Sequence, residues 1–81
     1  MTITVRFFAW LRDTVGCEAC PMTLPGGSTA SDARQAAAVH WPALAVLMIG
    51  VRPAINRAYG AWEDPLSDGD ELALIPPVSG G

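Results

Sequence analysis

Hydrophobic and polar residues alternate over the first segment of the chain, residues 2–8. A period of two predicts a half-buried β-strand. One face of this strand would carry Ile3, Val5 and Phe7, and the other Thr4, Arg6 and Phe8. Phe8 is therefore the exception, because it is an apolar side chain on the face that should meet solvent.

The next segments predict a helix, a strand and a longer helix. Residues 9–15 can form a short helix, and Gly16 is a plausible stop because glycine adopts the left-handed conformation without strain. A second short strand is expected around residues 19–24, and it would end in a Pro-Gly-Gly turn. Thr29 and Asp32 resemble a capping box, so the alanine-rich segment 30–40 is predicted to be the main helix.

The apolar side of this main helix consists of small residues. Ala30, Ala33 and Ala37 recur at helical spacing, and Trp41 extends the same row. Such a face would allow the helix to approach a sheet closely. Pro42 disfavours helical geometry at the preceding residue and should end the helix. Residues 43–51 are apolar, and their pattern fits either a helix or a strand.

The last third of the chain predicts two more strands. One covers residues 54–59, with Pro53 at its start, where a missing N–H is tolerable. The second follows a turn at Asp68-Gly69-Asp70 and covers residues 71–75. Its inward side chains would be Leu72 and Leu74, and its outward side chains Ala73 and Ile75.

The order strand, strand, helix, strand, strand predicts an α+β domain with one mixed sheet covered on a single face by the main helix. Ile75, like Phe8, is apolar on the face that should see solvent. If the first and last strands are neighbours, these two residues form an exposed apolar patch. A patch of this kind is typical of an interface.

Length and composition limit the possible functions. Eighty-one residues with 51% hydrophobic content predict one small globular domain without room for a large active-site cleft of its own. Five arginines, eight acidic residues and a net charge of -3 argue against nucleic acid or an anionic membrane as partner. No signal peptide or membrane-spanning segment is recognisable, so a cytoplasmic protein is expected.

The C-terminal sequence Pro-Pro-Val-Ser-Gly-Gly combines a stiff stem with a flexible end. Pro76 and Pro77 fix their own φ angles, so the tail should leave the domain in an extended direction. Gly80 and Gly81 have no β-carbon and could pass through a narrow channel. The terminal carboxylate is therefore a candidate reactive group that the tail could deliver to a partner.

The other candidate groups favour ordinary roles. Cys17 and Cys20 supply half of a zinc site at most, and His40 is the single histidine that could extend it. Incidental loop cysteines are favoured over a metal or redox site, so no metal is expected. Core or partly buried packing is favoured for the tryptophans, and a solvated face for Arg6, Arg12 and Arg57. No catalytic site can be assembled within the chain, which predicts that it is not an enzyme on its own.

Three segments resemble the MoaD family, the small sulfur-carrying subunits of molybdopterin synthase. They are residues 7–12 (Phe-Phe-Ala-Trp-Leu-Arg), residues 54–56 (Ala-Ile-Asn) before Tyr59, and residues 65–81 with the Pro-Pro-Val-Ser-Gly-Gly ending. Asp-Gly-Asp-Glu together with Gly-Gly also resembles the ThiS carriers of thiamine synthesis. The ending favours the molybdopterin branch.

The resemblance implies a β-grasp, ubiquitin-like domain over residues 1–77 and a carrier tail over residues 78–81. Gly81 would be adenylated by a MoeB-like, E1-like enzyme that uses ATP, and then converted to a thiocarboxylate. A MoaE-like large subunit, in a heterotetramer, would use this sulfur to convert a cyclic pterin precursor. No stably bound cofactor is implied. Val78, Ser79 and Gly80 would thread into the partner, and the contact residues would be Phe8, Tyr59 and Ile75.

The chain departs from the family pattern in its core. Members usually carry leucines where this main helix has Ala33 and Ala37, so Trp41 or Leu44 would have to fill the space. Pro53 beside a central strand is also unusual. The alternative functions are a carrier for thiamine thiazole or another pathway, a ubiquitin-like modifier joined through Gly81 to lysines, and a plain interaction module.

Overall fold

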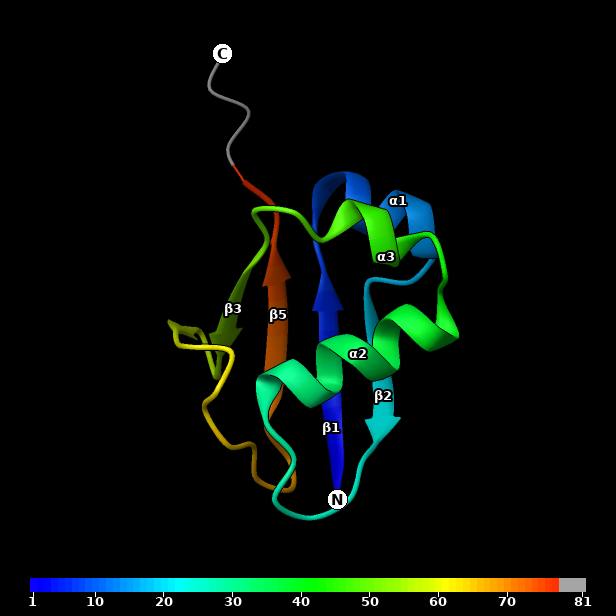
Figure 1. The fold of residues 1–81 in the computed structure, drawn as a ribbon. Helices are drawn as coiled ribbons and strands as arrows, with labels where there is room; N and C mark the ends of the chain where they lie inside the picture. The colour runs from blue at the N-terminus through cyan, green and yellow to red at the C-terminus, as the bar shows by residue number, and fades with distance from the viewer. Residues whose placement is uncertain (78–81) are drawn as a thin grey trace.

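The computed structural model describes residues 1–77, and residues 78–81 lie outside the described part. The described elements are β1 (Thr2–Phe7), α1 (Ala9–Val15), β2 (Ala19–Thr23), α2 (Ala30–His40), α3 (Leu44–Leu47), β3 (Arg52–Ile55), β4 (Ala58–Tyr59) and β5 (Glu71–Ile75). The five strands form one sheet in the order β2-β1-β5-β3-β4, and α2 lies across one face of this sheet (Figure 1). The expected mixed sheet covered on one face is therefore confirmed.

The first and last strands are neighbours in the centre of this sheet. They run parallel, with Val5 opposite Leu72 and Phe7 opposite Leu74, whereas the other strand pairs are antiparallel. All four of these side chains are buried. In β1 the buried residues alternate with more exposed ones, as predicted. In β5 the predicted inward residues Leu72 and Leu74 are buried, but Ala73, which was predicted to point outward, is buried as well.

Helix α2 begins at the predicted capping box. The Asp32 N–H donates to Thr29 Oγ1 at 3.2 Å, and the Thr29 N–H donates to Asp32 Oδ2 at 2.9 Å. Each bond satisfies a backbone donor that the first helical turn leaves free. The buried side of the helix consists of Ala30, Ala33 and Ala37, as predicted.

The space beside these alanines is filled from the segment that follows α2. Leu44, on the short helix α3, is completely buried, and the Trp41 ring meets the Phe7 ring edge to face at 5.1 Å between centroids. Both residues suggested by the sequence therefore contribute to the core. The pattern of residues 43–51 fitted either a helix or a strand, and the structure forms α3 near the start of this segment.

The prediction of a single strand over residues 54–59 is wrong. Two shorter strands, β3 and β4, pair as a hairpin whose turn residues Asn56 and Arg57 have φ angles of 51° and 70°. Positive φ at both positions is the geometry of a two-residue hairpin turn. Pro53 lies one residue before this pairing, and its carbonyl accepts the Gly60 N–H at 3.1 Å. Proline has no N–H to donate back to Gly60, so the pairing of β3 with β4 stops at Ala54 opposite Tyr59.

None of the helices in residues 1–77 is long and apolar enough to span a membrane.

Candidate functional site

A hollow of about 410 Å³ lies on the sheet face opposite α2. It is lined by Arg6, Phe8, Ala54, Arg57, Tyr59, Glu71, Ala73 and Ile75. These residues come from β1 and its end, from β5, and from the hairpin of β3 and β4. The structure thus brings together the three residues predicted to contact a partner, Phe8, Tyr59 and Ile75.

The three predicted contact residues differ in exposure. Phe8 is 39% exposed and Tyr59 is 61% exposed, whereas Ile75 is half-buried. Ile75 lies opposite Arg52 in the last pair of the β3–β5 ladder. Ala54 and Ala73 face each other across the same ladder and form a shallow floor between these larger side chains. The expected apolar patch of Phe8 and Ile75 therefore exists, and Tyr59 extends it.

Charged groups border this apolar surface. The Arg6 Nε donates to Glu71 Oε1 at 2.6 Å, and the Arg57 Nε lies 4.0 Å from Glu71 Oε2. The Arg52 guanidinium lies over the Tyr59 ring at 4.3 Å from its centroid, which is within cation–π distance. A solvated face was expected for the arginines, and Arg57 fits it because its side chain is 85% exposed. Arg6 does not fit this expectation, because its side chain is paired with Glu71. This partner was not predicted from the sequence.

The Asp-Gly-Asp motif fixes the start of β5 against the start of β1. Asp68 Oδ1 accepts the Thr2 N–H at 2.7 Å, and the Gly69 N–H donates to the Thr2 carbonyl at 2.8 Å. Gly69 has a φ of 86°, which explains why the turn uses glycine. The side chains of this motif therefore position β5, which carries both Ile75 and the stem of the tail.

Asn56 joins the hairpin to the same strand. Its Oδ1 accepts the Glu71 N–H at 3.0 Å, and its Nδ2 donates to Asp70 Oδ1 at 3.0 Å. Together with the Ser67 N–H, which donates to Asp70 Oδ2, this amide lowers the pKa of Asp70 below its usual value of 3.8. Asn56 thus holds the turn that carries Tyr59 beside β5. Asn56 belongs to the Ala-Ile-Asn segment identified in the sequence, but its hydrogen bonds to Asp70 and Glu71 were not predicted.

The stem of the tail continues directly from β5. Pro76 is half-buried and Pro77 is exposed, and β5 itself ends at Ile75. The tail residues Val78, Ser79, Gly80 and Gly81 lie outside the described residues, so their threading and reactive roles stay predictions.

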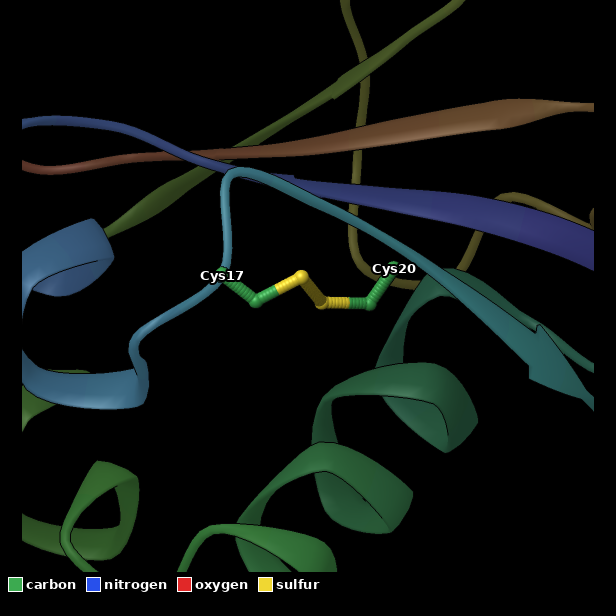
Figure 2. Close-up of a disulfide and its surroundings, with 2 residues drawn as sticks. All are labelled: Cys17 and Cys20. Carbon is green, nitrogen blue, oxygen red and sulfur yellow. A yellow bond between two sulfur atoms is a disulfide. The ribbon is translucent and has the colours of Figure 1, made fainter.

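Cys17 and Cys20 are joined in a disulfide with 6.4 Å between their Cα atoms (Figure 2). The sequence analysis favoured incidental loop cysteines, whereas here the two residues are paired with each other and Cys20 lies on β2. The chain turns back at Gly16, which has a φ of 75°, and this brings Cys17 close to the start of β2. Within residues 1–77, no group of three or more His, Cys, Asp or Glu side chains could hold a metal ion.

The tryptophans and His40 take mainly structural positions. Trp41 and Trp62 pack against the core, as predicted, and the Arg34 guanidinium lies 4.5 Å from the centre of the Trp62 ring. His40 meets the edge of Trp41 at 4.4 Å between centroids. Trp10 is the exception, because it is 40% exposed on α1.

The sheet order, the helix across one face and the stem after the last strand define a ubiquitin-like β-grasp domain. Solved structures with this fold are similar to the structure of this chain. The crystal structure of SAMP1 from Haloferax volcanii has a TM-score of 0.89 and 29% identity, with 100% of both chains covered. A complex of subunits 1 and 2 of the molybdopterin-converting factor from Helicobacter pylori gives a TM-score of 0.70 and 26% identity, again with 100% of both chains covered.

The ThiS family profile matches residues 5–81, and the chain belongs to this family. Its curated relatives include the molybdopterin synthase sulfur carrier subunits of Chlamydomonas reinhardtii and Escherichia coli. The algal protein is 39% identical, with 100% of both chains covered. The bacterial protein is 36% identical, with 98% of this chain and 99% of the relative covered.

Proposed function

We propose that this chain is the sulfur carrier of a molybdopterin synthase, with Gly81 as the residue that carries the sulfur. The observation that supports this most strongly is that the similarity to carrier subunits extends over nearly the full length of both proteins. The family match also includes the final glycine. The chain itself would supply no catalytic side chain, and its partners would activate and use the terminal carboxylate.

The proposed chemistry follows from the properties of a carboxylate. An ionised carboxylate is a poor electrophile, so an activating enzyme would transfer AMP from ATP to the Gly81 carboxylate and release pyrophosphate. Sulfide-level sulfur would then attack the acyl carbon and displace AMP, which is a good leaving group. The resulting thiocarboxylate is a soft nucleophile that can form carbon–sulfur bonds. Because ATP is an intracellular reagent, this proposal places the chain in the cytoplasm.

The hollow opposite α2 is the proposed docking surface for the large subunit. Exposed aromatic groups at Phe8 and Tyr59, with an apolar floor and charged rim, have the composition expected of a protein interface. β5 lines this hollow and leads directly into the stem. A partner bound there would receive the tail next to its docking surface. We propose a heterotetramer of two carriers and two large subunits.

Intact-mass measurement tests the carrier chemistry. After incubation with a MoeB-like activating enzyme, ATP and a sulfur donor, we expect one sulfur to replace one oxygen at Gly81. A chain that lacks Gly81 should stay uncharged and keep its melting temperature. The charged chain should then produce molybdopterin when it is mixed with the cognate large subunit and the pterin precursor. An unchanged mass, under conditions that charge a known carrier, would reject the proposal.

A ubiquitin-like modifier is the second candidate, because the relatives also include small archaeal modifier protein 1 of Haloferax volcanii. That protein is 32% identical, with 94% of this chain and 97% of the relative covered. A modifier would form stable bonds between Gly81 and lysines of other proteins. The chain contains no lysine, so it could not form lysine-linked chains with itself. A thiamine-type carrier would instead be charged with sulfur but would fail to produce molybdopterin with the large subunit.

A further inference from the structure

The hydrogen-bonded ladder between β3 and β5 ends just before the stem. Arg52 opposite Ile75 is its last pair, and the next two residues of the stem, Pro76 and Pro77, have no backbone N–H to donate. Continuing the same antiparallel register places Gly50 opposite Pro77. Beyond Ile75, packing must therefore replace hydrogen bonding in holding the stem beside the sheet.

Gly50 provides a close packing contact for the stem. A β-carbon on Gly50 would lie 3.2 Å from Cγ of Pro77, 3.5 Å from its Cβ and 3.8 Å from its Cδ. The first of these distances is shorter than ordinary van der Waals contact. Gly50 also has a φ of 77°, which favours glycine on conformational grounds. The proline ring thus packs onto backbone that has no side chain in the way.

We infer that Gly50 is a positioning residue that sets the direction in which the carrier tail leaves the domain. This inference rests on the proposed function, because it concerns delivery of the Gly81 thiocarboxylate. A side chain at position 50 would push the Pro77 ring away from the sheet. The four residues after Pro77 can reach at most about 13 Å, so little chain remains to correct a displaced stem inside a partner.

The inference predicts a separation between docking and chemistry. The docking surface lies around Phe8, Tyr59 and Ile75, which a substitution at position 50 leaves unchanged. The rate of sulfur transfer depends on where the thiocarboxylate meets the pterin, and a misplacement of 1 Å can reduce a rate by about 100-fold. Gly50→Ala should therefore slow transfer while the dissociation constant for the large subunit stays the same.

Gly16→Ala is a matched control. Gly16 has a φ of 75°, so alanine would be strained there to a similar degree, but a β-carbon at this position would have no atom within 4 Å. Both variants should lose a similar amount of melting temperature. A difference in transfer between them then reports the contact with Pro77 and not the strain of a left-handed alanine.

The experiment starts from chains whose Gly81 thiocarboxylate has been made chemically, by sulfide cleavage of an intein thioester, so that enzymatic activation plays no part. Each is mixed with the cognate large subunit and the pterin precursor, and the single-turnover rate is measured. We expect Gly50→Ala to be about 10-fold slower than wild type, since a shift below 1 Å should cost less than the 100-fold limit. Gly16→Ala should transfer at the wild-type rate.

Pro77→Ala provides a rescue test. It removes Cγ and Cδ of the ring and leaves only the Cβ, whose 3.5 Å distance from the added β-carbon is an ordinary contact. In a Pro77→Ala background, Gly50→Ala should therefore slow transfer by less than 2-fold, which is the coupling expected of residues in contact. In the free wild-type protein, a nuclear Overhauser effect between the Gly50 α-protons and the Pro77 ring should be present.

Several results would overturn the inference. Equal rates for Gly50→Ala and Gly16→Ala would show that the contact does not position the tail. A weaker affinity with an unchanged rate would place Gly50 in the docking surface instead. Absence of the Gly50–Pro77 Overhauser effect would remove its structural basis, whatever the function. Failure of the wild-type thiocarboxylate to transfer sulfur would reject the proposed function. This outcome differs from the others because the wild type and every variant would then fail together.

Discussion

At the scale of single residues, Phe8 combines a backbone role with a surface role that mutation can separate. It is the N-cap of α1, with φ −124° and ψ 156°, and it makes no side-chain capping bond. Aspartate is a favoured N-cap residue, whereas apolar residues are not. Phe8→Asp should therefore leave the melting temperature unchanged or raise it. The same change should weaken binding to the large subunit by about 30-fold, or about 2 kcal/mol, as expected for loss of a central aromatic contact.

The measurement for Phe8 is titration calorimetry of each variant with the large subunit, combined with thermal unfolding of the free chain. Val39→Asp is a suitable control, because Val39 is 82% exposed on α2, on the other side of the sheet. An unchanged affinity of Phe8→Asp would exclude this residue from the interface. Unfolding of the variant would show that the ring stabilises the domain.

Asp70 gives the chain a predictable response to acid. Its lowered pKa means that the folded state favours the carboxylate, through Asn56 first and the Ser67 N–H second. This contribution to stability is present above the unfolded pKa of about 3.8, and is lost as the pH falls through the lower folded pKa. Asp70→Asn should therefore lower the melting temperature at pH 7, and the difference from wild type should shrink toward pH 2.

Thermal unfolding between pH 2 and pH 7 measures this difference. Glu63→Gln, on an exposed part of the loop before β5, is the control and should differ little from wild type throughout. A difference between wild type and Asp70→Asn that stays constant with pH would mean that hydrogen-bond geometry, and not charge, links Asp70 to the turn.

At the scale of elements, the hairpin turn contains two of the three non-glycine residues with a positive φ in residues 1–77. Arg57 adopts a φ of 70°, a region in which a side chain costs free energy and glycine does not. Arg57→Gly should relieve this cost, although glycine loses more entropy on folding. We expect a net gain of up to about 1 kcal/mol in the free energy of unfolding, measured by urea denaturation.

Arg57→Ala is the matched variant for this prediction. It also removes the 4.0 Å approach to Glu71, but it keeps a β-carbon in the left-handed region. It should therefore be less stable than Arg57→Gly. If both variants lose the same stability, the interaction with Glu71 outweighs the backbone strain.

The same hairpin shows where sequence patterns are sufficient and where they fail. β1, α1, α2 and β5 follow from local signals, namely alternation, the capping box and Gly16, because those signals depend on near neighbours in the chain. The turn at Asn56 and Arg57 lacks the glycine that normally marks a two-residue hairpin, so two strands were predicted as one. The bonds of Asn56 to Asp70 and Glu71 could not be predicted, because they join residues 14 and 15 positions apart.

At the scale of the whole molecule, the core combines the small buried side chains of α2 with a large buried side chain from α3. Ala33 and Ala37 let α2 approach the sheet, and Leu44 fills the adjoining space from α3. Leu44→Ala should therefore leave a cavity and cost about 2–5 kcal/mol, measured by denaturant unfolding. Ala45→Gly, at an exposed position of the same helix, is the control and should cost about 1 kcal/mol or less. A loss below about 1 kcal/mol at Leu44 would mean that Trp41 can move into the space.

The two faces of the sheet also separate the disulfide from the proposed docking surface. Cys20 lies opposite Val5, whose side chain is part of the core beneath α2, whereas the hollow lies on the other face. Closing a loop of about four residues contributes about 2 kcal/mol in the chain-entropy account of disulfides. Replacing both cysteines with serine should therefore lower the free energy of unfolding by at least about this amount, because Cys20 is also buried.

Sulfur transfer should survive this double replacement, because neither cysteine lines the hollow. The test measures the single-turnover rate and the affinity for the large subunit at a temperature where the variant remains folded. Reduction of the wild-type disulfide with a dithiol supplies the same comparison without a change of sequence, and it should lower the melting temperature in the same direction. Loss of transfer in a folded double variant with normal affinity would mean that these sulfur atoms participate in the chemistry. The domain would then be more than a support for Gly81.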